Sequence, residues 1–162
     1  MNDSIAQAFI AQAKRHLTQE FLPKLRRCVA ELSPQQLWWR PNQNSNSVGN
    51  LLMHLEGNLR QWIIAGLGGQ PDDRRRDQEF AQRKAIPGDR LMQSLEETVQ
   101  EAIQVMERLD APSLLEEHSI QVYQATGLEA IFHVVEHFSY HTGQILYITK
   151  SVKDVDLRLY DL

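Results

Sequence analysis

Cysteine and long apolar segments are nearly absent from this sequence. Cys28 is the only cysteine among 162 residues, so the chain cannot form an internal disulfide, and the disulfide framework of a small secreted domain is excluded. No stretch approaches the ~20 apolar residues that cross a bilayer, and the N-terminal residues lack the pattern of a signal peptide. We therefore expect a cytoplasmic protein without a membrane partner.

A strong excess of one charge is missing as well. The chain carries 17 Lys and Arg against 21 Asp and Glu, which gives a net charge of -4. The basic residues are scattered apart from the run Arg74–Arg76, so the basic surface of a nucleic-acid-binding protein is not expected. We interpret this run as a solvated part of a loop, because that is what most short charge runs are.

The length and composition indicate one globular domain, residues 1–162. Hydrophobic residues make up 42% of the chain and charged residues 23%, which is close to the average for globular proteins. A domain of about 150 residues buries roughly two thirds of its unfolded surface, so it needs neither a metal nor a disulfide to stay folded. If the chain binds a metal, we expect the metal to serve chemistry.

Four long segments carry apolar residues at every third or fourth position, which is the spacing of one helix face. They cover residues 4–32, 47–65, 89–109 and 128–150. Residues 66–88 are rich in glycine, proline and charge and are expected to form a long connection, while residues 113–125 are ambiguous. Because no convincing pair of strands accompanies these segments, we predict an all-α fold, a four-helix bundle with long connections.

Single residues predict where these helices begin, bend and approach one another. Pro23 lacks a backbone donor, so the first helix should kink or break near Glu20. Ser47 and Asp89 are expected to cap the second and third helices. Gly143 lowers helix stability inside the fourth helix, which indicates that a neighbouring element approaches closely there.

Three histidines recur every four residues in the last predicted helix. His133, His137 and His141 advance by about 40° per step and therefore occupy one narrow strip of its surface. Two imidazoles spaced in this way can bind one zinc, nickel, copper or iron ion. The alternative is a polar edge of ordinary hydrogen-bonded histidines. Relative to the apolar arc of this helix, His141 lies nearest the core and His133 nearest the polar side.

His54 is the candidate third ligand. It lies in the second helix among apolar residues, and facing helices of a bundle approach within about 8 to 10 Å. It lies about 120° from the centre of its helix's apolar stripe, so periodicity alone does not direct it inward. A hydrogen-bonded core histidine is therefore the alternative. Our hypothesis for the ligands is His54, His137 and His141, with His133 in an outer or surface role.

The same residues carry a family resemblance. Residues 44–64 and 133–150 resemble the DinB-like superfamily (damage-inducible protein B, YfiT-like) of small bacterial four-helix bundles. The family pattern is a histidine followed by leucine in the second helix, which His54-Leu55 match, and HxxxHxGQ in the fourth helix, which His137 to Gln144 match. The closing residues 156–162 resemble those of one uncharacterised subgroup.

The resemblance implies a divalent metal, zinc or nickel, held by His54, His137 and His141 with coordination positions left open. Characterised relatives are transferases and isomerases that use a low-molecular-weight thiol as a co-reactant. A metal-dependent enzyme with a small electrophilic substrate is thus implied. The alternatives are a hydrolase that activates water, and a metal-binding or ligand-binding stress protein without catalysis. An assembly module with structural histidines is disfavoured, because the family motif is complete.

Residues outside the motif raise expectations about proton transfer and thiol chemistry. His133, Glu136 and Glu56 are candidate proton carriers, although each is also interpretable as a surface or outer residue. Cys28 is more simply a plain helix residue than a reactive thiol, because no second cysteine accompanies it. The general acid and base are not assigned.

The tryptophans indicate self-association. Trp38, Trp39 and Trp62 lie at predicted helix ends or near loops, where an exposed apolar patch can form. Small bundles of the DinB-like family often pair. We therefore expect a homodimer.

Overall fold

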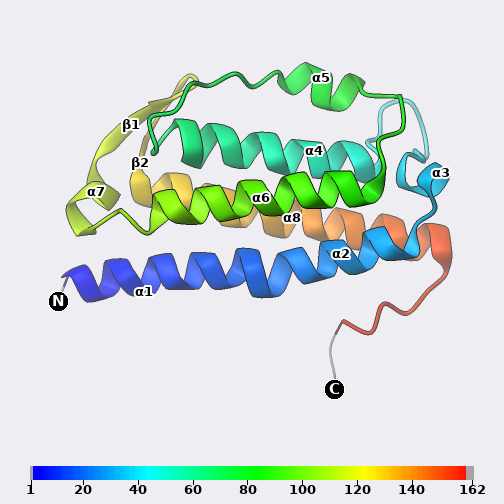
Figure 1. The fold of residues 1–162 in the computed structure, drawn as a ribbon, viewed down its shortest axis with the longest axis horizontal. Helices are drawn as coiled ribbons and strands as arrows, with labels where there is room; N and C mark the ends of the chain where they lie inside the picture. Colours follow the sequence, from blue (N-terminus) through cyan, green and yellow to red (C-terminus); the bar gives the residue numbers. More distant parts are fainter. Residues whose placement is uncertain (1, 160–162) are drawn as a thin grey trace.

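Residues 2–159, which the structure describes, form four helical rods that lie side by side (Figure 1). The structure is a computed structural model. The first rod joins α1 (Asn2–Arg15), the π-helix η1 (His16–Phe21) and α2 (Leu22–Glu31); the second joins α4 (Val48–Leu59) and the π-helix η2 (Arg60–Ala65); α6 (Gly88–Met106) and α8 (Gly127–Lys153) are the others. The predicted all-α helical bundle is confirmed, and each rod begins and ends within a few residues of its predicted bounds.

The irregularity expected near Glu20 is a π-helical segment rather than a break. In η1 the turn is wider, and the amide of Leu22 donates to the carbonyl of Leu17, five residues earlier. Pro23 follows directly, in the first turn of α2, where its missing amide donor costs little. The wide turn therefore accommodates the proline, and the first rod stays continuous.

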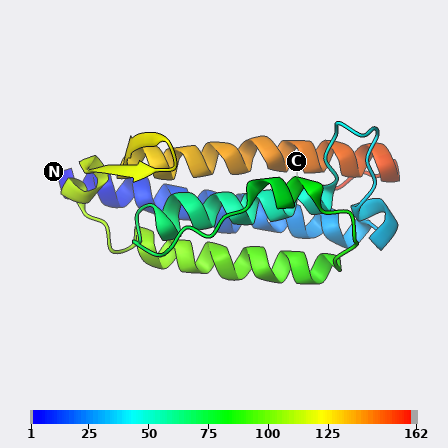
Figure 2. The same ribbon diagram turned by 90° about the horizontal axis from the view of Figure 1, so that it is seen from above.

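The direction of α4 and α6 explains the longest connection. Figure 1 shows both helices running the same way, from the end near α3 (Pro34–Leu37) toward the end near the N-terminus. The chain must therefore return along the bundle before α6 begins. Residues 66–87, which we call the crossover, make this return over the outer face of α4 (Figure 2). The crossover is mostly irregular, as predicted, but it contains a short helix, α5 (Arg76–Ala81), packed on α4.

A short helix and a β-hairpin connect α6 to α8, and sequence analysis does not predict the hairpin. α7 (Ala111–Leu115) precedes β1 (Glu117–Ile120), which pairs antiparallel with β2 (Tyr123–Thr126). In this register Glu117 is opposite Thr126. Each strand has four residues, and the turn lacks glycine and asparagine although Gln121 has a φ of 56°. The usual hairpin signals are therefore missing.

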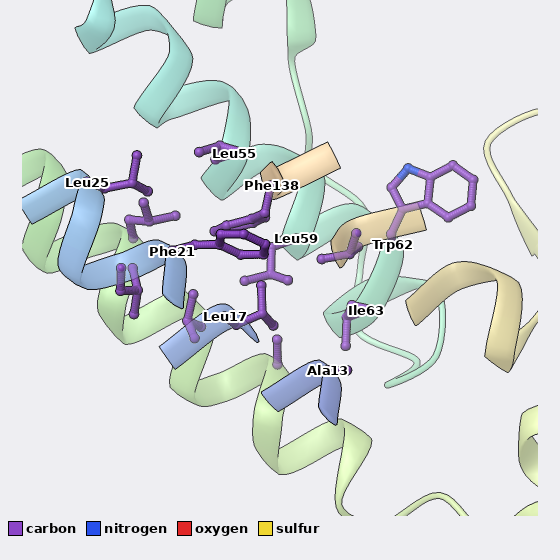
Figure 3. Packing of buried hydrophobic residues seen from close by; sticks show 14 of the residues in the cluster. Ala13, Leu17, Phe21, Leu25, Leu55, Leu59, Trp62, Ile63 and Phe138 are labelled. Carbon is purple, nitrogen blue, oxygen red and sulfur yellow. The ribbon is translucent and has the colours of Figure 1, made fainter. Parts of the chain in front are cut away.

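The core lies between all four rods. Figure 3 shows Phe21 of the first rod beside Phe138 of α8, with ring centroids 6.3 Å apart, and apolar side chains of α4 and η2 next to them. The large side chains that are fully buried include Leu17, Leu25, Leu55, Leu59, Ile63 and Phe138. Burying each such side chain contributes roughly 1.5–3 kcal/mol, so apolar packing is the main source of stability of the bundle.

Two local expectations about the helices are wrong. Asp89 does not cap the third rod, because α6 begins at Gly88 and the N-cap position is Pro87, which makes no side-chain bond. Gly143 is exposed, and a β-carbon built on it has no atom within 4 Å, so no neighbour approaches closely there. Ser47 does cap α4 as predicted, because its hydroxyl accepts from the amide of Asn50.

The tryptophans do not form the exposed patch expected of them. Trp62 is 8% exposed and belongs to the core, because η2 turns this side chain inward. Trp38 is half-buried, and its indole donates to the carbonyl of Ile86 at 3.0 Å. Trp39 is the exposed one of the three. The tryptophans therefore provide no apolar patch for the homodimer that the sequence predicts.

The structure also bears on the expectations about membrane spans, about Cys28 and about the closing segment. No helix within residues 2–159 has both the length and the apolarity to cross a membrane. Cys28 is fully buried, and this burial raises the pKa of its thiol, which agrees with a plain helix residue. Of the closing segment 156–162, residues 160–162 lie outside the described residues.

Candidate metal centre

α4 and α8 bring the selected histidines to one place. His54 lies on α4, and His137 and His141 lie on successive turns of α8. The Nε2 atoms of His54 and His141 lie 3.0 Å and 3.1 Å from Nε2 of His137. One ring nitrogen from each residue lies within 4.8 Å of the other two. We call His54, His137 and His141 the triad.

His141 is the most buried histidine of α8, as its helix position predicts. His141 is 8% exposed, whereas His133 and His137 on the same helix are half-buried. His54 is 5% exposed although it lies away from the apolar stripe of its helix. The crossover covers this face of α4, which is why periodicity alone does not predict that His54 is buried.

Two rings of the triad have an oxygen acceptor behind them. Nδ1 of His54 lies 2.8 Å from Oε2 of Glu79, and Nδ1 of His141 lies 2.7 Å from Oε1 of Gln144. An ionised carboxylate and an amide oxygen only accept hydrogen bonds, so a proton on each Nδ1 satisfies both contacts. Both Nε2 atoms then present a lone pair to His137. This is the tautomer in which a histidine binds a metal through Nε2.

His137, the third residue of the triad, has fewer hydrogen-bond partners than its ring can use. Nδ1 of His137 is buried without a hydrogen-bond partner among the described residues. Its Nε2 faces the lone pairs of His54 and His141, and a proton there can be shared with only one of them. A cation placed among the three Nε2 atoms would engage all three lone pairs. The donor set therefore fits a divalent ion of the kind that imidazole binds.

Burial also keeps the two triad histidines of α8 in the neutral form. Burial, together with the positive charge that His141 and His54 can carry, lowers the pKa of His137 to about 2. Burial likewise lowers the pKa of His141, although the hydrogen bond to Gln144 opposes this shift. A histidine must be unprotonated to bind a metal. Both rings on α8 are therefore ready to act as ligands without losing a proton.

His133 adjoins the triad but faces another group. Its Nε2 accepts from Nδ2 of Asn58 at 3.1 Å, and its ring stacks on Trp62 with 4.0 Å between centroids. Burial lowers the pKa of His133. Its ring centroid lies 5.6 Å from that of His137, so it lies beside the triad while its bonded nitrogen is directed at Asn58. This agrees with the outer role that its helix position predicts.

The carboxylate that contacts the triad is Glu79, which sequence analysis does not single out. Of the predicted carboxylates, Glu136 is exposed, and Glu56 accepts hydrogen bonds from Arg60 and Ser94. Glu79 is 7% exposed. Burial alone raises its pKa, but hydrogen bonds from His54 and Arg74 outweigh this effect and hold the pKa below the ordinary value. Glu79 is thus an ionised partner of His54.

The side chain of Arg74 is buried, which corrects its interpretation as part of a solvated run, whereas Arg75 and Arg76 are exposed as expected. The side chain of Arg74 is 6% exposed. Nε and Nη2 of Arg74 donate to the two oxygens of Glu79 at 2.7 Å and 3.0 Å, and Nη1 donates to Gln61 at 2.9 Å. The buried charge is tolerated because the carboxylate neutralises it. Apolar periodicity does not indicate which charged residues of a polar connection turn inward. Sequence analysis therefore misses both Arg74 and Glu79.

Comparison with known protein families agrees with this architecture. The model of the family DUF1572, described as a protein of unknown function, matches residues 4–161. The chain belongs to this family. DUF1572 is part of the DinB-like fold family, so the resemblance carried by the two histidine motifs is confirmed.

A solved structure shows the same fold. The crystal structure of a DinB-like protein, YjoA, from Bacillus subtilis is similar to this chain with a TM-score of 0.65. The match covers 87% of this chain and 91% of that chain at 15% sequence identity, which is a likeness of fold alone. No curated protein matches the sequence significantly.

Proposed function

We propose that the chain binds one divalent metal ion, zinc or nickel, through Nε2 of His54, His137 and His141. The observation that carries the proposal is the convergence of these three atoms, with acceptors behind two of the rings. Three protein ligands leave positions for other molecules, which is typical of catalytic rather than structural zinc sites. The proposed site therefore serves chemistry on a bound small molecule.

We further infer that the site activates a low-molecular-weight thiol of the cytoplasm toward a small electrophile. A divalent ion with neutral ligands lowers the pKa of a thiol or water bound to it. The chain does not offset the charge of the ion, because the nearest buried carboxylate, Glu79, is already neutralised by Arg74. The choice of a thiol over water follows from the DinB-like relatives.

The surroundings of the triad support a site for small molecules. The ring of Phe80 lies 4.6 Å from His54, and that of Tyr140 lies 5.0 Å from His141, both measured between centroids. The half-buried Phe80 shields one side of His54 from water, and the exposed Tyr140 places an aromatic surface at the edge of the triad.

A cobalt-substituted protein tests the proposal. A sulfur ligand on Co²⁺ produces an intense near-ultraviolet charge-transfer band, and an oxygen ligand does not. We expect cysteine to produce this band and serine, its oxygen analogue, to leave the spectrum without it. If cysteine leaves the spectrum of the cobalt-loaded protein unchanged, thiol activation is wrong, and activation of water becomes the better proposal.

A further inference from the structure

Glu79 links the triad to the crossover. Its carboxylate meets Nδ1 of His54 at 2.8 Å from α5, outside the four rods. Its backbone carbonyl accepts a hydrogen bond from Nδ2 of the fully buried Asn50 at 2.7 Å. Glu79 is therefore attached to α4 through both its backbone and its side chain. The crossover thereby reaches one ligand of the proposed metal site.

Two groups of opposite character lie next to Nδ1 of His54. The Glu79 carboxylate only accepts hydrogen bonds, and Nη2 of Arg74, 3.0 Å from Nδ1, only donates them. Nδ1 cannot offer a proton to one group and a lone pair to the other at the same time. Nη2 donates one hydrogen to Oε2 of Glu79 and has the carbonyl of His54 at 3.5 Å for the other, so Nδ1 donates to the carboxylate and keeps its proton. Without Glu79, the remaining donor would favour a proton on Nε2, the atom that binds the ion.

Gly57 gives Glu79 and Arg74 the space to reach His54. A β-carbon built on Gly57 overlaps the Glu79 carboxylate and lies 3.0 Å from Nε of Arg74. Gly57 lies on α4 three residues after His54. The carboxylate is the far end of a flexible side chain, so a methyl group at Gly57 would displace it from His54 without disturbing the core.

We propose that Glu79 is a positioning residue of the metal site, which keeps the proton of His54 on Nδ1 and its Nε2 lone pair directed at the ion. Arg74 orients and neutralises the carboxylate, and Gly57 provides the space. The inference rests on the proposed function and extends it, because it makes the crossover a part of the metal site. Loss of the carboxylate contact lowers metal affinity about 10- to 100-fold, as is usual for a group hydrogen-bonded to a ligand.

The tautomer of His54 is measurable without a metal. Nitrogen-15 NMR of the imidazole rings distinguishes a protonated ring nitrogen from a bare one. In the metal-free wild type we expect the proton of His54 on Nδ1. Glu79→Ala should move it to Nε2, whereas Arg74→Ala leaves the acceptor in place and should keep it on Nδ1. A proton on Nε2 in the wild type, or on Nδ1 in Glu79→Ala, overturns the proposal.

Metal affinity provides the second readout, with a matched pair of glycine variants. Gly57→Ala displaces the carboxylate but keeps every charge, whereas Gly143→Ala adds the same methyl group to a helix position with no atom within 4 Å. Zinc titration against a competing chelator should show a loss of about 10-fold or more for Gly57→Ala and Glu79→Ala. Gly143→Ala should bind zinc like the wild type.

The two readouts separate this inference from the proposed function. Wild-type affinity in both Gly57→Ala and Glu79→Ala overturns the positioning role and leaves metal binding intact. A wild type that binds no divalent metal overturns the proposed function, and the NMR measurement on metal-free protein then decides alone whether Glu79 fixes the tautomer of His54.

Discussion

His137 shows how burial alters the chemistry of a single residue. Its pKa is about 2 in the folded protein, against ~6.5 for an exposed histidine. Below about pH 6.5 the unfolded chain takes up a proton that the folded chain does not. The free energy of unfolding of the metal-free protein should therefore fall as the pH decreases, with His137 contributing at most about 1.4 kcal/mol per pH unit. Urea unfolding of His137→Leu should show a smaller pH dependence, and an unchanged dependence would contradict the buried neutral state.

Cys28 is expected to be inert in the folded protein. It is fully buried on α2, and burial raises the pKa of its thiol, although a hydrogen bond with Thr149 opposes this shift. Little thiolate is therefore present at neutral pH, and reagents have no access to it. The chromogenic reagent DTNB should label Cys28 only after unfolding in guanidinium chloride. Rapid labelling of the native protein would contradict this description of its surroundings.

The histidines of the triad are predictable from the sequence, and the partner of His54 is not. A four-residue spacing places His137 and His141 on one helix face, and the family pattern adds His54. Glu79 lies 25 residues from His54 in a polar segment. Its burial depends on how the crossover lies against α4, which no local pattern reports. Gln144 is different, because it is three residues from His141 on the same helix and belongs to the motif.

At the scale of elements, the long helices are predictable because each buries one continuous face. Their apolar periodicity extends over many turns, and caps such as Ser47 mark their starts. α5 has six residues, too few for a stable isolated helix, and it forms where it packs on α4. The two hairpin strands have four residues each, which is too short to show a clear alternation of apolar and polar residues. The sequence therefore predicts the bundle and leaves its connections undetermined.

A capping box stabilises the start of α8, the helix that carries His137 and His141. The hydroxyl of Thr126 accepts from the amide of Glu129, and the carboxylate of Glu129 accepts from the amide of Thr126. Thr126→Ala should lower the free energy of unfolding by about 1 kcal/mol, and Thr126→Ser should retain most of the stability. Equal urea midpoints for the wild type and Thr126→Ala would show that this cap does not stabilise α8.

At the scale of the whole molecule, an exposed apolar strip on α8 is the surface on which we expect two copies to associate. Leu128, Phe132, Tyr140 and Tyr147 are all exposed and fall within about 120° of the helix circumference, where they alternate with the exposed Glu129, Glu136 and Lys150. Such a strip is more typical of an interface than single exposed residues are. Sedimentation should give a dimer mass, and Phe132→Glu should shift it toward the monomer. A monomer mass at every concentration would contradict the homodimer.

The central claim is that one metal ion joins α4 to α8 through three histidines, and the metal content of the protein tests it most directly. Elemental analysis of zinc-loaded, desalted protein should give one ion per chain for the wild type. His54→Ala, His137→Ala and His141→Ala should each lose most of this metal, whereas His133→Ala, the control on the same helix, should retain it. Full metal content in His54→Ala would contradict the account.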